Sequence, residues 1–135
     1  MRHRKAGKKL NRNTAQRKAL FKNLIQSLIL HEEIKTTEAK AKAIKGLMAK
    51  LISKAKKGSL HKRRQIMAFL PDKRAVKKLF DDLGPRFKQR NGGFTRFVRL
   101  GNRKGDDAMI VRLELTEKKE KEAKEEKTKK KDKKK

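Results

Sequence analysis

The sequence predicts an α+β fold, in which four helices precede a β-hairpin and pack on a small sheet. Two observations predict this class. Between residues 14 and 84, apolar residues recur every three or four positions in four stretches, the period of helices with one buried face. Between residues 94 and 115 they recur every second position, the period of half-buried strands. We therefore expect one domain at 14–116, after an arm at 1–13 and before a tail at 117–135.

The first helix is expected over residues 14–31. Its apolar stripe runs from Leu20 to Ile29 at three- and four-residue spacing. The side chain of Asn13 or Thr14 can cap its first backbone N–H groups. Because the residues before this stripe are almost all polar, the sequence places the start of the domain here.

A brief strand at residues 33–36 and a long second helix are expected next. Ile34 and the adjacent threonines are β-branched, which favours a strand. Thr37 followed by Glu38 predicts the next helix start, with a carboxylate in its first turn. Gly58 is expected to end that helix in the left-handed conformation.

The third and fourth helices are delimited by caps and helix breakers. Ser59 can cap a helix that Pro71 ends. Asp72 can cap a further helix, which Gly84 and Pro85 are expected to close. Each helix has its own apolar stripe, so both are expected to contribute to the core.

The hairpin is expected to consist of strands at 94–100 and 109–115. The turn between them, residues 101–107, contains Gly, Asn, Arg, Lys and Asp. Strict alternation places Arg96 on one face of the first strand and Arg99 on the other. The sequence therefore predicts a hairpin with a cationic loop.

The composition excludes several classes of protein. The 135 residues include no Cys, Trp or Tyr, so disulfides and thiolate metal sites are excluded. No apolar run has the length of a membrane span, and no secretory signal is found. His3, His31 and His61 are far apart, and neither a phosphate-binding glycine loop nor a nucleophile–His pair occurs. We expect a cytoplasmic protein that is not an enzyme and has no metal, cofactor or small-molecule substrate.

Positive charge dominates the sequence. The formal net charge is +28, and 43% of the residues are charged. The tail holds eleven lysines against six acidic residues and has no apolar stripe, so it is expected to be disordered. The first eighteen residues hold eight Lys and Arg and no Asp or Glu. Such an arm cannot bury enough apolar surface to order itself, so its expected partner is a nucleic acid.

Three cationic segments supply the candidate RNA-binding residues. The arm and the first helix contribute Arg2, His3, Arg4, Lys5, Lys8, Lys9, Asn11, Arg12, Asn13, Arg17, Lys18 and Lys22. The hairpin and its basic lead-in, which begins at Arg86, contribute Arg90, Arg96, Arg99, Arg103 and Lys104. The third helix contributes Arg63 and Arg64, near a helix start that favours anions. The polar side of an amphipathic helix explains this last cluster equally well.

RNA is favoured over DNA and over membranes. The sequence has no zinc ligands, no heptads after a basic region and no visible helix-turn-helix, which are the usual signs of DNA-reading proteins. A compact basic body with a long arm suits a large folded RNA, in which the arm passes between helices. The alternatives are an architectural DNA-binding protein of the nucleoid and a cationic membrane-active protein. The latter needs a helix whose apolar face is not used in the core.

Four separated segments resemble one known family. They are MRHRKAGKKLNRN at 1–13, RKALFKNL at 17–24, HEEIKTTEAKAKAIK at 31–45 and GGFTRFVRLGNRKGDDAMIVRLEL at 92–115. Together they resemble the bacterial L17 family of large-subunit ribosomal proteins. The resemblance implies a two-layer α/β domain with a mixed three-stranded sheet. The implied order is β-α-β-α-α-α-β-β, or the same order without its first strand.

The resemblance also implies a function and partners. It implies a structural constituent of the large ribosomal subunit, which binds large-subunit rRNA near the polypeptide exit tunnel, next to other ribosomal proteins. It adds Thr36 and Thr37 to the expected RNA contacts of the arm and the hairpin. The tail after Thr116 lies outside the shared pattern, so the resemblance implies nothing about it.

Overall fold

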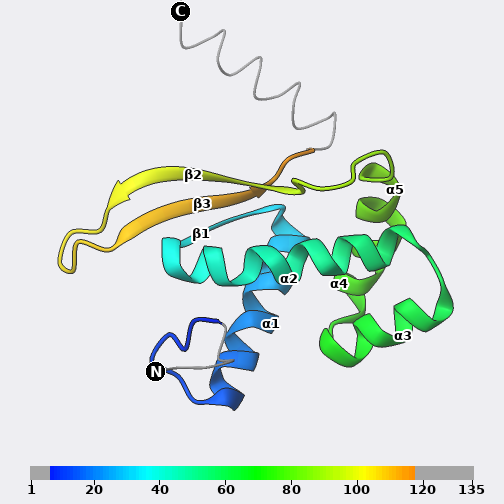
Figure 1. Ribbon diagram of the computed structural model, residues 1–135, viewed down its shortest axis with the longest axis horizontal. Helices are drawn as coiled ribbons and strands as arrows, with labels where there is room; N and C mark the ends of the chain where they lie inside the picture. Colours follow the sequence, from blue (N-terminus) through cyan, green and yellow to red (C-terminus); the bar gives the residue numbers. More distant parts are fainter. Residues whose placement is uncertain (1–6, 118–135) are drawn as a thin grey trace, which may run out of the picture.

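A three-stranded antiparallel sheet lies on one side of the helices in the computed structural model, which describes residues 7–117 (Figure 1). The elements are α1 (Thr14–His31), β1 (Glu33–Thr37), α2 (Glu38–Lys56), α3 (Leu60–Phe69), α4 (Lys73–Lys78), the π-helical turn η1 (Leu79–Leu83), α5 (Gly84–Arg86), β2 (Thr95–Asn102) and β3 (Met109–Leu115). The segment α4–η1–α5 is unbroken and forms the fourth predicted helix. The predicted α+β class is confirmed. The predicted tail lies outside the described residues, except for its first residue.

The predicted helix boundaries are confirmed at several positions. Asn13 accepts a hydrogen bond from the backbone N–H of Gln16, whose side chain accepts one from the N–H of Asn13, so α1 begins with a capping box. Ser59 and Asp72 cap α3 and α4 by accepting backbone N–H bonds. Gly58 follows α2 with φ +64°, the left-handed conformation. Local sequence therefore sets these boundaries.

The sheet has the order β1-β3-β2, and both strand pairs are antiparallel. The prediction of a mixed sheet is wrong, because β3 lies between β1 and β2, the two strands that run in the same direction. No strand precedes α1 within residues 7–117, as in the predicted order without a first strand. β2 extends into the predicted turn through a register shift between Arg99 and Gly101, where φ of Gly101 is +121°.

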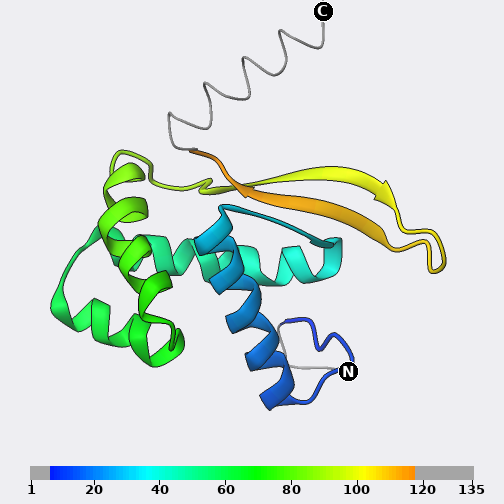
Figure 2. The same cartoon turned by 180° about the vertical axis from the view of Figure 1, so that it is seen from behind.

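The core lies between one face of the sheet and the apolar stripes of the helices. Both views place α1 and α2 on the same side of the sheet (Figures 1 and 2). The largest fully buried side chains are Ile25, Leu28, Ile29, Ile44, Met48, Ile52, Ile66, Leu70, Leu79, Leu83, Phe87 and Leu113. Phe87 falls in the predicted basic lead-in, yet its ring meets that of Phe94 edge to face at 5.4 Å.

The third helix contributes less to the core than its stripe predicts. Leu60 is 64% exposed and Met67 is 44% exposed, although both belong to the apolar residues of this helix. Within α3 only Ile66 is fully buried, and Leu70 just after the helix is buried as well. The helix therefore packs through its C-terminal end, and its N-terminal half faces solvent.

The fourth predicted helix continues through Gly84 and Pro85 instead of ending there. It widens into η1 just before Pro85 and ends at Arg86. In a regular α-helix a proline ring collides with the carbonyl four residues earlier, and a wider turn accommodates the ring. Gly84 is buried and packs closely against α2. A Cβ added to it would lie only 3.3 Å from the carbonyl oxygen of Ala55. The missing side chain allows the two helices to approach closely.

Gly84→Val is expected to lower the free energy of unfolding by about 2 kcal/mol, because the added side chain must displace the backbone of α2. Gly46→Ala is the matched control. Gly46 lies in α2 with open space around an added Cβ, so alanine is expected to stabilise the protein by about 0.8 kcal/mol. Urea denaturation followed by circular dichroism measures both effects, since the chain has no Trp or Tyr for fluorescence. A Gly84→Val protein as stable as wild type would contradict the close packing.

Candidate nucleic-acid interface

The described part of the arm is anchored to the start of α1. Leu10 and Asn11 have φ of +54° and +50°, and the N–H of Arg12 donates across this turn to the carbonyl of Lys9 at 3.2 Å. The guanidinium of Arg12 donates to the carbonyl of Leu10 at 3.0 Å, and that of Arg17 donates to the carbonyl of Arg12 at 3.2 Å. Two of the predicted RNA-binding arginines therefore fix the path of the chain as it enters α1.

Three predicted lysines near the arm are free to meet an anion. Lys8, Lys9 and Lys18 are exposed and form no ion pair with any residue in 7–117. Asn13 is occupied as the cap of α1, and Lys22 lies 5.9 Å from the centroid of an α3 phenylalanine ring. The remaining predicted arm residues, Arg2, His3, Arg4 and Lys5, lie outside the described residues.

The tip of the hairpin carries Arg103 and Lys104. The guanidinium of Arg103 donates to the carboxylate of Asp106 at 2.9 and 2.5 Å. The hydrogen bond from Arg103 lowers the pKa of Asp106 to about 2, and Asp106 in turn raises the pKa of Arg103. Both side chains are about half exposed, so solvent weakens this pair and a phosphate can displace the carboxylate.

Arg96 and Arg99 lie on opposite faces of the sheet, as the alternation predicts. Arg96 donates to Glu114 at 2.7 Å, and Glu114 is fully buried on the neighbouring strand. The guanidinium of Arg99 lies 3.5 Å from the carboxylate of Glu38 at the start of α2. Their side chains are 63% and 73% exposed. The hairpin therefore presents these arginines in two directions, each beside a carboxylate.

The other predicted residues differ in how free they are. Thr36 and Thr37 are half-buried at the end of β1, where they pair with β3. Arg90 is held by the carbonyl of Gly93 at 3.1 Å. On α3, Arg64 is exposed, whereas Arg63 lies 5.6 Å from the centroid of a phenylalanine ring of η1.

The predicted residues do not form a single surface. Residues 7–13 of the arm and the hairpin tip lie toward one end of the long axis of the molecule, and α3 lies toward the other (Figures 1 and 2). The arm and the hairpin can therefore engage one partner from the same end. The cations of α3 belong to a separate region.

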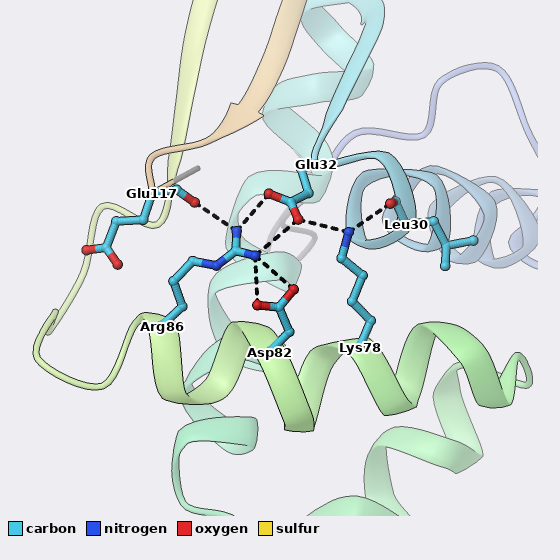
Figure 3. Close-up of polar contacts among 6 residues, drawn as sticks. All are labelled: Leu30, Glu32, Lys78, Asp82, Arg86 and Glu117. Carbon is cyan, nitrogen blue, oxygen red and sulfur yellow. Dashed lines mark hydrogen bonds and ion pairs between the residues drawn. The ribbon is translucent and has the colours of Figure 1, made fainter. Parts of the chain in front are cut away.

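Sequence reasoning missed a largely buried ion-pair network, centred on the buried Glu32, that joins the end of α1 to the α4–η1–α5 segment (Figure 3). Glu32, at φ +63°, accepts hydrogen bonds from Arg86 at 2.7 and 3.2 Å and pairs with Lys78 at 2.8 Å. Arg86 also pairs with Asp82 at 2.8 Å and donates to the carbonyl of Glu117 at 3.0 Å. The interpretation of Arg86 as part of an RNA-facing lead-in is therefore wrong, since its side chain is committed inside the fold.

The network keeps its members charged. Burial raises the pKa of Glu32, but hydrogen bonds from Arg86 and Lys78 lower it more, so the pKa lies below the ordinary 4.5. Burial lowers the pKa of Arg86, and the hydrogen bonds to Glu32 and Asp82 raise it by more. These contacts hold the end of the arm-bearing helix against the other helices.

Glu32 is expected to make the free energy of unfolding depend on pH in the acidic range. Because its pKa is lower in the folded than in the unfolded chain, its contribution is complete above about pH 4.5 and is lost as the pH falls through the folded pKa. Glu32→Gln cannot titrate, so it should lose less stability than wild type between about pH 5 and about pH 2.5. Urea denaturation across this range measures the difference, and the other acidic groups titrate in both proteins. Equal losses of stability in wild type and Glu32→Gln as the pH falls would contradict this role of Glu32.

The fold and the surface together define a class of protein. Residues 7–117 contain no group of three or more His, Cys, Asp or Glu that could hold a metal ion. No helix in this range is long and apolar enough to cross a bilayer. A small α+β body with many exposed Lys and Arg and a basic arm is typical of the small basic proteins of ribonucleoprotein particles.

Comparison with known proteins identifies the family. The sequence model described as "Ribosomal protein L17" matches residues 20–116. A "Large ribosomal subunit protein bL17" of Desulforapulum autotrophicum is 49% identical over 85% of this chain and 96% of that protein. The protein of the same name from Geobacter metallireducens is 47% identical over 90% of this chain and 70% of that protein. The one from Clostridium perfringens is 48% identical over 80% of this chain and 96% of that protein. The chain belongs to the ribosomal protein L17 family. The predicted family and the predicted location, in the ribosome in the cytoplasm, are therefore confirmed.

Proposed function

We propose that this protein is a structural, non-catalytic constituent of the large ribosomal subunit, which binds and stabilises large-subunit rRNA near the polypeptide exit tunnel. The names of its relatives support the assignment to the large ribosomal subunit. The observation that carries rRNA binding is the arm, where Lys8 and Lys9 are exposed without an ion pair in the described part of the chain. The position near the tunnel rests on the family resemblance.

The proposed mode of binding divides the chain into an arm at 1–13, a body at 14–116 and a tail at 117–135. The body is folded before binding, and the arm takes its shape among rRNA strands. At the hairpin, phosphates compete with Asp106 for Arg103 and with Glu38 for Arg99, and Lys104 adds a free charge. The partners are rRNA and neighbouring ribosomal proteins, not a membrane or a small molecule.

Sedimentation of a cell lysate that contains the tagged full-length chain tests this function. We expect the protein to travel with large subunits and to remain there after washing at high salt. Crosslinking within intact subunits should then place the arm and the hairpin on rRNA near the tunnel. Recovery with the nucleoid would instead favour an architectural DNA-binding protein. Recovery with membranes would favour the cationic membrane-active alternative.

Salt is expected to weaken the binding of the isolated protein to large-subunit rRNA. Each phosphate contact releases counterions, so it lowers the logarithm of the binding constant by about 0.9 for each tenfold rise in salt, the value for double-stranded DNA. Lys104→Gln should therefore reduce the slope by about 0.9, since Lys104 forms no ion pair with any described residue. Filter binding at several salt concentrations measures the slope. An affinity that does not change with salt would contradict phosphate recognition.

A further inference from the structure

A hollow of about 410 Å³ lies where the end of α2, the start of α3 and the η1–α5 segment meet. These elements lie toward the end of the molecule away from the hairpin tip (Figure 1). Three cations line the hollow, Lys56, Arg63 and Lys88, together with one carboxylate, Asp81. We call it the cationic hollow. The arm and the hairpin contribute nothing to its lining, so it is a separate candidate site.

Two of the cations are held in place before any ligand arrives. The ammonium of Lys56 donates to the carbonyl of Arg90 at 2.5 Å and lies 5.8 Å from the centroid of the Phe94 ring. Arg63 lies 5.6 Å from the centroid of the Phe80 ring, as described above. Each keeps further N–H donors for a ligand, since an ammonium has three and a guanidinium five. Binding an anion here therefore costs little side-chain entropy.

The lining also allows a ligand to approach the backbone. Gly58 and Gly84 contribute no side chain to it, and Ala55 contributes only a methyl group. The volume exceeds that of a single phosphate and lies within the range of pockets that hold small organic groups. The cationic hollow thus has room for a sugar beside the phosphate.

Asp81 decides between the possible ligands. A carboxylate repels a phosphate, so a site for phosphate alone gains nothing from it. A ribose hydroxyl can donate a hydrogen bond to a carboxylate, and the 2′-hydroxyl is the group that distinguishes RNA from DNA. We propose that the cationic hollow binds one ribose–phosphate unit of RNA, with the phosphate on Lys56, Arg63 and Lys88 and the 2′-hydroxyl on Asp81. This proposal rests on the proposed function, in which the partner is rRNA.

Nuclear magnetic resonance titration of the full-length chain tests the proposal. Uridine 5′-monophosphate (UMP), its 2′-deoxy analogue (dUMP) and inorganic phosphate are the probes, and the amide signals of Gly58 and Gly84 report on the cationic hollow. We expect UMP to bind about fivefold more tightly than dUMP, because only UMP carries the 2′-hydroxyl that donates to Asp81 in the proposed geometry. Asp81→Ala should bind dUMP and phosphate more tightly and reduce the preference for UMP to less than about twofold.

Two further variants complete the test. Lys88→Gln should weaken all three probes by a similar factor, whereas Lys104→Gln at the hairpin tip should leave the Gly58 and Gly84 titrations unchanged. Equal binding of UMP and dUMP to wild type, or a preference that persists in Asp81→Ala, would overturn the proposal. So would an equal effect of both lysine variants. Sedimentation with large subunits is unaffected by these outcomes, so a failure of the hollow and a failure of the proposed function are distinguishable.

Discussion

Removal of residues 2–13 is expected to reduce incorporation of the protein into large subunits by at least about tenfold, which corresponds to roughly 1.4 kcal/mol. The segment carries six Lys and Arg and no Asp or Glu. Each of these cations that meets a phosphate releases counterions, so losing even half of them removes more than this free energy at low salt. Incorporation is measured by sedimentation of lysates that contain the tagged truncated chain.

The truncated body should remain folded. The hydrogen bonds between residues 7–13 and the body are those that Arg17 donates to the carbonyls of Arg12 and Asn13 and those of the cap at Asn13. Losing the cap costs about 1 kcal/mol, so a deletion of residues 2–12, which keeps Asn13, is the better-matched variant. Circular dichroism should then show an unfolding transition close to that of wild type.

Charge and length can be separated with a second pair of variants. Replacing the six cations of residues 2–13 by Gln preserves the length of the arm and should impair incorporation as the deletion does. Replacing six lysines of the tail by Gln removes the same charge and should have little effect, because the family resemblance ends at Thr116. Similar losses in both variants would show that net charge, and not the arm, drives binding.

The sequence predicts those parts of the fold that depend on neighbours in the chain. The capping box at Asn13, the caps of α3 and α4 and the left-handed Gly58 each involve residues within a few positions of one another. The strands were predicted within one or two residues for the same reason. The antiparallel pairing of β1 with β3 was not predicted, because it joins segments about eighty residues apart. The resemblance implied a mixed sheet instead.

The candidate site could be predicted only in part. The sequence identifies the cations, and Arg103 with Asp106 is a local pair, but the partners of Arg96 and Arg99 lie 18 and 61 positions away. Nothing in the composition separates these paired cations from free ones such as Lys8. Asp82 and Arg86 are four residues apart on one helix face, which was the one local sign of the buried network.

Arg86→Met is expected to lower the free energy of unfolding by about 3 kcal/mol, the usual cost of removing one partner from a buried ion pair. The change leaves Glu32 with Lys78 as its cation and removes both hydrogen bonds to Asp82. Methionine keeps most of the volume of the arginine stem, so a cavity contributes little. Urea denaturation followed by circular dichroism measures the loss.

Arg103→Met is the matched control for this loss, because it removes an arginine from an exposed pair and should cost less than about 1 kcal/mol. A double-mutant cycle of Arg86→Met with Glu32→Gln separates the interaction from other effects of substitution. The double variant should be more stable than the sum of the two single losses predicts, because Glu32→Gln removes the buried carboxylate that Arg86→Met leaves with Lys78 as its cation. If Arg86→Met costs no more than Arg103→Met, the network does not hold α1 against the α4–η1–α5 segment. The position of α1 relative to this segment would then depend on apolar packing and on the hydrogen bond from Gln26 to Asp72.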